Sequence, residues 1–123
     1  MKPETSSFSH LDLGRAGEDA AVKFLKKQKF KILERNYRVK SGEIDIVAWD
    51  RDTLVFVEVK TRQSDFFAPP IQSVGFRKQR KLRRLVDRYL AGHEVPEGDV
   101  RFDVISIVMH RGKPEIEHIR NAF

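Results

Sequence analysis

The hydrophobic pattern is clearest between residues 42 and 61, where apolar and polar side chains alternate on either side of a polar turn. Alternation at period two predicts a pair of strands that form a hairpin. One face is expected to carry Ile44, Ile46 and Ala48, then Val55, Val57 and Val59 on the returning strand. The opposite face is apolar near the turn and charged at its far end, with Glu43, Asp45, Val47, Trp49, Leu54, Phe56, Glu58 and Lys60.

The length of the turn decides which charged residues of the hairpin meet. A slip of one residue inverts every side chain, so Asp45 and Glu58 share a face only if the loop has an even number of residues. A four-residue loop at 50–53 fits a type I turn that begins with Asp. A two-residue loop at 51–52 gives the same register but lacks the Gly or Asn of a primed turn. Both loops pair Trp49 with Leu54, Asp45 with Glu58, and Glu43 with Lys60.

The opposed carboxylates of Asp45 and Glu58 indicate a site for a cation. Directly opposed side chains have Cβ atoms roughly 5 Å apart, and two carboxylates at that separation can share one divalent ion. Without a cation the pair is unfavourable, because opposed like charges destabilise a strand pair and resist double ionisation. Alternatively, Lys60 and neighbouring arginines neutralise the acids of the hairpin in an ion-pair network at the sheet edge.

The chain before the hairpin predicts a helix and a strand. Residues 1–10 are expected to form a flexible tail and residues 11–123 a single domain. The helix begins at Leu11, with Asp12 as its N-cap and an apolar stripe of Ala20, Ala21, Phe24 and Leu25. Gly14 and Gly17 in its first turns permit another backbone to approach closely. Glu18 leans towards the stripe, either as an acid favoured by the helix dipole or as a functional residue.

The remaining elements complete an α/β order. Residues 30–39 are typical of a strand with an irregularity, and further strands are predicted at 100–109 and near 115–119. The loop at 62–70 carries Phe66 and Phe67, which either pack on the core or stack on unpaired bases. With a second helix over residues 71–91, the order is α-β-β-β-α-β followed by a small β addition.

The second helix combines an apolar stripe with a strongly basic face. The stripe contains Val74, Leu82, Leu85, Val86 and Tyr89, and Lys78 interrupts it near the helix start. The Lys78 ammonium either extends to solvent or reaches the carboxylates of the hairpin. The outward face carries Arg77, Arg80, Lys81, Arg83, Arg84 and Arg88. Such a dense basic run favours contact with phosphates, and therefore a nucleic-acid partner.

Composition narrows the class of protein further. The net charge of +6 favours an anionic partner, and the absence of cysteine excludes disulfides and thiolate metal sites. The histidines lack the spacing of a metal-binding pair, and no phosphate-binding glycine loop or serine–histidine–acid cluster is present. No apolar run approaches the roughly 20 residues that cross a bilayer, and no signal peptide is recognisable. We therefore expect a cytoplasmic protein without a membrane partner.

The order of acids and lysine in the hairpin resembles the PD-(D/E)xK pattern of nucleases: Asp45, then twelve residues, then Glu58-Val59-Lys60. Further stretches resemble the YraN-like family, small bacterial proteins grouped with predicted endonucleases and similar to archaeal Holliday-junction resolvases. These stretches are GRAGEDAAVKFL (14–25), ILERNYRVKSGEIDIVA (32–48), LVFVEVKTR (54–62), KQRKL (78–82) and RFDVISI (101–107). The resemblance implies a restriction-endonuclease-like core, with a central mixed β-sheet flanked by helices. The sequence departs from the nuclease pattern at Ile44, which stands where the pattern has proline.

The resemblance implies a catalytic site at Glu18, Asp45, Glu58 and Lys60. Asp45 and Glu58 would hold Mg²⁺ or Mn²⁺, which activates water and offsets charge on the scissile phosphate. Lys60 would orient the water or stabilise the developing charge, and Glu43 would position Lys60. The expected phosphate contacts are Arg15, Arg38, Arg62, Arg77, Lys78, Arg80, Lys81 and Arg84.

These features together predict metal-dependent hydrolysis of phosphodiester bonds in DNA. A preference for branched DNA is implied by the resemblance alone. The resemblance also implies that the protein can form a homodimer. The alternative is a non-catalytic nucleic-acid-binding module that has kept the nuclease fold. A structural protein with a basic surface is a third interpretation, and it predicts neither metal binding nor steep salt dependence of DNA affinity.

Overall fold

The computed structural model describes residues 10–64 and 76–122. Their elements follow the order α1 (His10–Lys27), β1 (Lys31–Val39), β2 (Gly42–Asp50), β3 (Thr53–Gln63), α2 (Phe76–Gly92), β4 (Val100–His110) and β5 (Lys113–Ile119). The predicted order is confirmed, and α1 begins one residue before the predicted Leu11. The predictions for residues 1–9, Phe66, Phe67 and Val74 fall outside the described residues.

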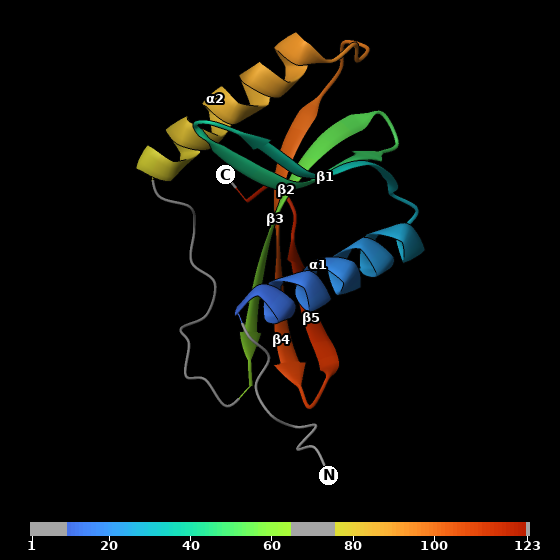
Figure 1. Cartoon of the computed structure of the whole chain (residues 1–123). Helices are drawn as coiled ribbons and strands as arrows, with labels where there is room; N and C mark the ends of the chain where they lie inside the picture. Colours follow the sequence, from blue (N-terminus) through green and yellow to red (C-terminus); the bar gives the residue numbers. More distant parts are fainter. Residues whose placement is uncertain (1–9, 65–75, 123) are drawn as a thin grey trace.

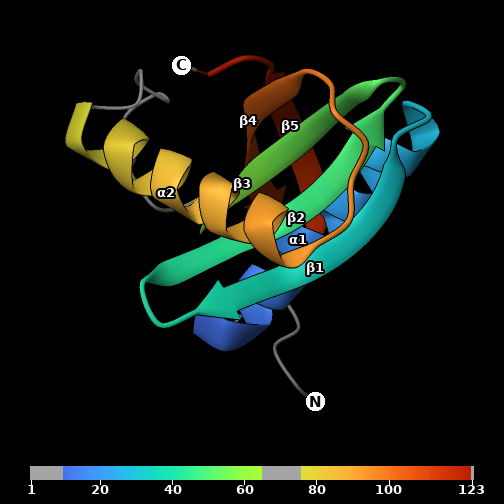
Figure 2. The ribbon, with the colours of Figure 1, turned by 90° about the horizontal axis from the view of Figure 1, so that it is seen from above.

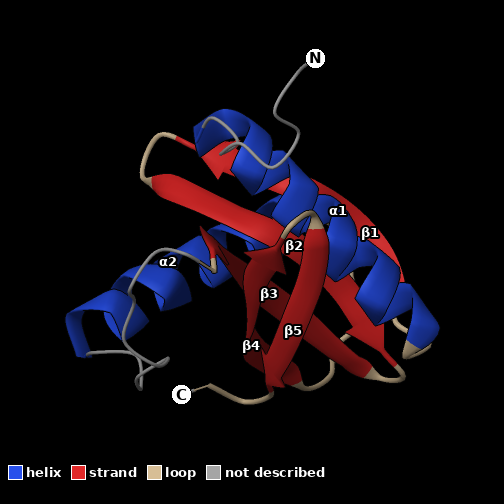
Figure 3. Ribbon diagram, turned by 90° about the horizontal axis from the view of Figure 1, so that it is seen from below, coloured by secondary structure: helices blue, strands red, loops and turns tan. Residues whose placement is uncertain are grey.

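The strands form one five-stranded mixed sheet in the order β1-β2-β3-β4-β5. Only β3 and β4 run parallel among these neighbours, and α2 lies in the connection between them. A parallel pair needs such a crossover, whereas the antiparallel pairs are joined by short turns. Helices α1 and α2 cover opposite faces of the sheet (Figures 1, 2 and 3). The predicted α/β class with a mixed sheet flanked by helices is confirmed.

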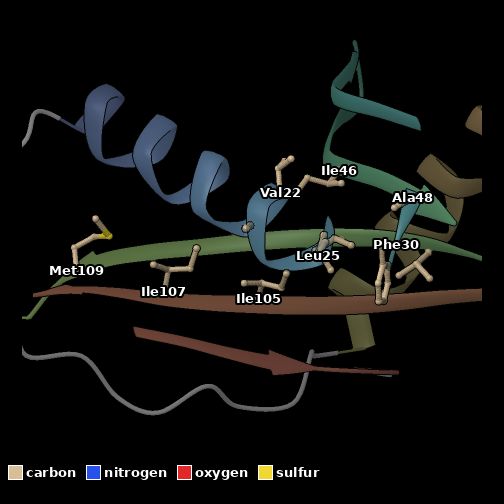
Figure 4. Packing of buried hydrophobic residues seen from close by; sticks show 11 residues of the cluster. Val22, Leu25, Phe30, Ile46, Ala48, Ile105, Ile107 and Met109 are labelled. Carbon is tan, nitrogen blue, oxygen red and sulfur yellow. The ribbon is translucent and has the colours of Figure 1, made fainter. Parts of the chain in front are cut away.

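Each helix covers its own hydrophobic cluster. Under α1, Ala21, Val22 and Leu25 pack with alternate residues of the three central strands (Figure 4); these are Ile46, Ala48, Val55, Val57, Ile105, Ile107 and Met109. Under α2, Leu82, Leu85, Val86 and Tyr89 pack on Val47, Leu54, Phe56 and Phe102. The sheet is therefore buried on both faces at its centre, which fixes the positions of its strands against each other.

The β2–β3 hairpin has the predicted register and the shorter of the two predicted turns. Trp49 pairs with Leu54 and Asp50 pairs with Thr53, so the loop has the two residues of the second predicted alternative, and the four-residue type I turn is not formed. Arg51 meets the geometry of the tight turn by adopting a φ of 57°. Left-handed residues in two-residue loops match the twist of the strands, and Arg51 accepts this conformation without the Gly or Asn that usually provides it.

The sheet opens at the end of the hairpin that carries the acids. The ladder between β2 and β3 ends at Ile46 and Val57, whereas β2 stays paired with β1 as far as Gly42. Strand β3 meanwhile stays paired with β4 along its whole length. Figure 1 shows the tip of the β1–β2 hairpin beside α2, while β3 continues away from it next to β4. Gly42 packs closely there, since a Cβ would lie 3.1 Å from Leu85 Cδ1.

No helix in the described segments 10–64 and 76–122 has the length and apolarity needed to span a membrane.

Candidate active site

Asp45 lies where β2 and β3 separate. Its Oδ2 accepts a hydrogen bond of 2.8 Å from the backbone N–H of Val59, just beyond the last residues of the ladder. The carboxylate thus receives an N–H at the point where β2 and β3 no longer pair through their backbones. This bond holds the half-buried Asp45 carboxylate within the gap, beside Glu58 on the neighbouring strand.

The alternation of faces along β2 is interrupted at Asp45. Strict alternation predicted Ile44, Ile46 and Ala48 on one face, but Ile44 packs in the cluster under α2 instead. The predicted side for Ile44 is therefore wrong. The irregularity is shared with β1, where Asn36 has a φ of 56° and no residue is paired with Asp45. Asp45 lies in this irregular part of β2, where it is half-buried and lines a cavity on either side.

Burial and nearby charges make the Asp45 carboxyl a weaker acid than usual. Burial is the main cause, and it raises the pKa of Asp45 from 3.8 to about 6. The hydrogen bond from Val59 opposes this change in the pKa, and the negative charges of Glu43, Glu18 and Glu58 reinforce it. The negative charge of the neighbouring acids therefore adds to the effect of burial at this position.

Glu58 extends from β3 towards the N-terminal end of α2. Its Oε2 accepts a 2.8 Å hydrogen bond from Lys78 Nζ. Of the two alternatives predicted for Lys78, the structure therefore shows contact with the hairpin carboxylates. The other oxygen, Oε1, is buried and has no hydrogen-bond partner in the described chain. An unpaired buried carboxylate oxygen is costly, so half of the Glu58 carboxylate is left unsatisfied.

Glu18 is held in place from β1. Its Oε1 accepts hydrogen bonds from Arg35 Nε (3.0 Å) and Asn36 Nδ2 (2.9 Å), and its side chain is only 12% exposed. Gly17, the preceding residue, lies so close to the Thr61 side chain that a Cβ would overlap it. The close approach predicted for the glycines is thus made by Gly17 to a side chain, whereas nothing lies within 4 Å of a Cβ at Gly14.

Glu43 pairs with β1 instead of β3. Arg38 Nε donates a 2.9 Å hydrogen bond to Glu43 Oε2, and the two residues are partners in the β1–β2 ladder. The predicted pairing of Glu43 with Lys60 is not formed, because β2 has left β3 before it reaches Glu43. Glu43 therefore contributes negative charge beside Asp45, and it is paired with Arg38, which was predicted to contact phosphate.

Two cavities meet at Asp45. A cleft of about 1380 Å³ separates the acids from α2 and is lined by Glu43, Asp45 and Glu58 on one side. Its other side carries the cations Arg77, Lys78, Arg80, Lys81 and Arg84. A smaller cavity of about 440 Å³ reaches Asp45 from the α1 side, where it is lined by Arg15, Glu18 and Arg38 among others. Four of the six basic residues that were predicted to face outwards therefore line the cleft, namely Arg77, Arg80, Lys81 and Arg84, whereas Arg83 and Arg88 are not part of its lining.

Lys60 and Arg62 are the predicted site residues that the cavities do not include. Lys60 is exposed and Arg62 is half-buried on β3, and neither lines the two cavities around Asp45. The structure therefore brings Asp45, Glu58, Glu43 and Lys78 together at one cleft and places Glu18 at the adjoining cavity. Lys60 follows Glu58 by two residues on the same strand but stands outside this arrangement.

The acids fit a divalent cation that keeps most of its own water. Within the described segments, no three acidic or histidine side chains lie close enough to hold a metal ion together. Mg²⁺ commonly binds through one or two carboxylates and retains several waters, so Asp45 and Glu58 suffice. A nearby cation would give the unpaired Oε1 of Glu58 a partner and would lower the raised pKa of Asp45. The donor set is hard oxygen, which suits Mg²⁺ or Mn²⁺.

Sequence reasoning did not find the residues that position Glu18, or a buried network on β4. Asp103 is fully buried and accepts hydrogen bonds from Arg101, His118 and the backbone N–H of Asn121. The sequence contained one indication that Asp103 is buried, because alternation along β4 places it on the same side of the strand as Ile105, Ile107 and Met109, which are buried. The partners of Glu18, Arg35 and Asn36, have no such signal because they lie in the irregular part of β1.

Comparison with known proteins identifies the family. Residues 17–107 match the model of uncharacterised protein family UPF0102, a range that includes the cleft acids and all of α2. A UPF0102 protein of Geobacter metallireducens is 48% identical over 117 residues, covering 95% of this chain and 96% of its own. Relatives in Chlorobium phaeobacteroides (47% identical, 95% and 98% covered) and Rhodococcus opacus (43%, 93% and 98%) carry the same family description. The chain therefore belongs to the UPF0102 family.

Proposed function

We propose that this protein is a metal-dependent nuclease that hydrolyses phosphodiester bonds in DNA, with Mg²⁺ or Mn²⁺ held by Asp45 and Glu58. The observation that carries the proposal is the cleft between two opposite charges. Two carboxylates lie in the gap between separated strands, one with an unpaired buried oxygen, and five cations of α2 lie across from them. A phosphate bound by the cations would lie next to the acids.

The residues of the cleft divide into groups that bind and groups that orient. The cations of α2 would hold the phosphates of the backbone, as basic helices do through charge and hydrogen bonds. Asp45 and Glu58 would hold the metal, which when bound activates water and offsets the charge of the scissile phosphate. The hydrogen bond from Val59 orients Asp45, and Arg35 and Asn36 orient Glu18 towards the adjoining cavity.

The resemblance to the YraN-like family and to the PD-(D/E)xK pattern supports the same chemistry. The mixed sheet with α1 and α2 on opposite faces agrees with a restriction-endonuclease-like core. In that pattern Lys60 stabilises developing charge, and its exposed ammonium is free to turn towards a bound phosphate. Preference for branched DNA and assembly as a homodimer belong to the proposal through the resemblance alone.

Cleavage of labelled four-way junction, duplex and single-stranded DNA, each with Mg²⁺ or Mn²⁺, tests the proposal. We expect cutting by the wild-type chain and a loss of at least about 100-fold in Asp45→Asn, Glu58→Gln and Lys60→Ala, because each removes charge that acts in the transition state. Glu115→Gln is the control, since Glu115 is exposed on β5 and pairs with His110. If all these variants cut as well as the wild type, the proposed site is wrong.

A non-catalytic nucleic-acid-binding module remains the second candidate, and the ion pair of Lys78 with Glu58 favours it. The pair neutralises one acid without a metal, as a purely structural site would. Both candidates predict that replacing Arg77, Lys81 and Arg84 by Gln lowers the slope of log affinity against log salt by up to about 2.7, from three lost phosphate contacts. Salt-sensitive binding without cleavage in any metal supports the module instead of the nuclease.

A further inference from the structure

We propose that Lys78 is an exchangeable counter-ion: it neutralises Glu58 in the metal-free protein and moves to a nucleic-acid phosphate when a divalent cation binds. This inference rests on the proposed function and adds a coupling between its two ligands. Metal binding would release a cation for phosphate, and phosphate binding would release a carboxylate for metal. Because such coupling is reciprocal, each ligand would tighten the other to the same degree.

The contact between Lys78 and Glu58 is suited to exchange. The Lys78 side chain is 42% exposed, so its ammonium can leave the carboxylate without breaking a packed structure. Ion pairs with this much exposure contribute little to stability, because solvent screens the charges and ordering the side chains costs entropy. Glu58 keeps a second oxygen, the unpaired Oε1, that a metal could take even before Lys78 departs.

Lys78 also stands where a helix does not favour a cation. It is the third residue of α2, and the first turn of that helix contains no acid. The positive end of the helix dipole repels a lysine there, so its position is compensated by Glu58 across the cleft. If a divalent cation neutralised Glu58, Lys78 would face positive charge from both the helix end and the metal. An anion would then be the favoured partner for its ammonium.

The cleft supplies the second position for Lys78. Arg77, Lys81 and Arg84 line the same cleft from the first turns of α2, so a phosphate held by them would lie within the reach of the lysine side chain. The exchange therefore needs only a change of side-chain rotamer, with α2 fixed by its packing on the sheet through Leu82 and Leu85.

Mn²⁺ binding, measured by calorimetry or by the paramagnetic signal of the free ion, tests the exchange without any cleavage. Lys78→Met removes the ammonium and keeps the length of the side chain. We expect it to bind Mn²⁺ about two- to fivefold more tightly than the wild type without DNA, the factor that corresponds to an exposed ion pair. Lys81→Met is the matched control, because Lys81 lines the same cleft one turn later and has no ion pair with an acid in the described chain.

The coupling itself is measured from the affinity for a labelled DNA duplex with and without Ca²⁺. Ca²⁺ takes the same hard oxygen ligands. We expect Ca²⁺ to tighten duplex binding in the wild type and in Lys81→Met, and to have at least a twofold smaller effect in Lys78→Met. Equal Mn²⁺ affinity in Lys78→Met and the wild type, or equal changes in both lysine variants, overturns the exchange alone. Absence of any Mn²⁺ binding to the wild type overturns the proposed metal site as well.

Discussion

At the scale of single residues, the surroundings of each acidic side chain decide the direction in which its pKa is shifted. Asp45 is half-buried and Asp103 is fully buried, but their surroundings shift the pKa in opposite directions. Burial raises the pKa of Asp45, and the negative charges of Glu43, Glu18 and Glu58 raise it further. Burial alone would also raise the pKa of Asp103, but hydrogen bonds from His118, Arg101 and Asn121 outweigh burial and lower it. Of these two buried or half-buried acids, the one at the proposed metal site lacks a cationic partner that lowers its pKa.

The raised pKa of Asp45 predicts a pH-dependent cost to stability. In the unfolded chain Asp45 ionises near 3.8, and in the folded chain near 6. Folding is therefore disfavoured progressively as pH rises through this window, and the cost persists above about pH 6. We expect Asp45→Asn to raise the melting temperature relative to wild type at pH 7.5, without metal, and to lose this advantage at pH 4.

The control for this prediction is Asp87→Asn, since Asp87 is exposed on α2. Its melting temperature should differ from the wild type by the same amount at both pH values. Added Mn²⁺ should stabilise the wild type at pH 7.5 and leave Asp45→Asn unchanged. A melting temperature of Asp45→Asn below that of the wild type at pH 7.5 would contradict the raised pKa of Asp45.

At the scale of elements, the site exists because β2 and β3 pair for only part of their length. Hydrophobic alternation predicted both strands and the register between Trp49 and Leu54, since side-chain period and turn length fix these locally. The separation beyond Ile46 was not predictable in the same way. It arises because β2 stays paired with β1 while β3 stays paired with β4. The packing of Gly42 beside Leu85 holds the end of β2 next to α2.

The contact of α1 with β3 predicts opposite effects for two glycines of the same helix. Gly17→Ala places a Cβ into the Thr61 side chain and should destabilise the protein by about 1–3 kcal/mol, the cost of overpacking. Gly14→Ala meets nothing within 4 Å and should stabilise it by about 0.5–1 kcal/mol through helix propensity. Urea unfolding at neutral pH measures both free energies. Equal effects of the two substitutions would show that α1 does not contact Thr61 in this way.

At the scale of the whole molecule, two clusters of charged groups in the described residues differ in how completely their acids are paired. The cleft between β2, β3 and α2 holds acids with incomplete partners. Asp103 on β4, in contrast, is tied to His118, Arg101 and Asn121, and Arg101 continues the network to Asp50 on β2 at 2.9 Å. The second cluster joins the last strand and the chain after it to the centre of the sheet. The sequence pattern places Asp103 on a buried side of its strand. It does not indicate hydrogen-bond partners that lie 15 residues or more away in the chain.

The Asp103 network predicts a strong effect on global stability. Asp103→Asn removes the buried charge that pairs with Arg101 and His118, although Arg101 keeps Asp50, and should cost about 3 kcal/mol of unfolding free energy at neutral pH. Since the pKa of Asp103 is lowered on folding, its contribution is present above about pH 4 and is lost as pH falls below that value. The wild type should therefore approach the variant in stability at low pH. Glu117→Gln, exposed on β5, should show neither effect.

Two other features of the whole molecule also lay beyond the sequence pattern. The basic face of α2 was predicted, because arginines and lysines repeat on it, but its orientation over a cleft follows from how Leu82 and Leu85 seat the helix on the sheet. The partner of Lys78 was left open between solvent and the hairpin, and the distance of 2.8 Å to Glu58 decides it.

Mn²⁺ titration of the full chain at pH 7.5 tests the proposed divalent metal site of Asp45 and Glu58. We predict one site in the wild type and in Glu115→Gln, and its loss in both Asp45→Asn and Glu58→Gln. Binding should weaken as pH falls through about 6, because protons compete for Asp45. Wild-type affinity in both site variants, or no binding by the wild type, would contradict the proposed site.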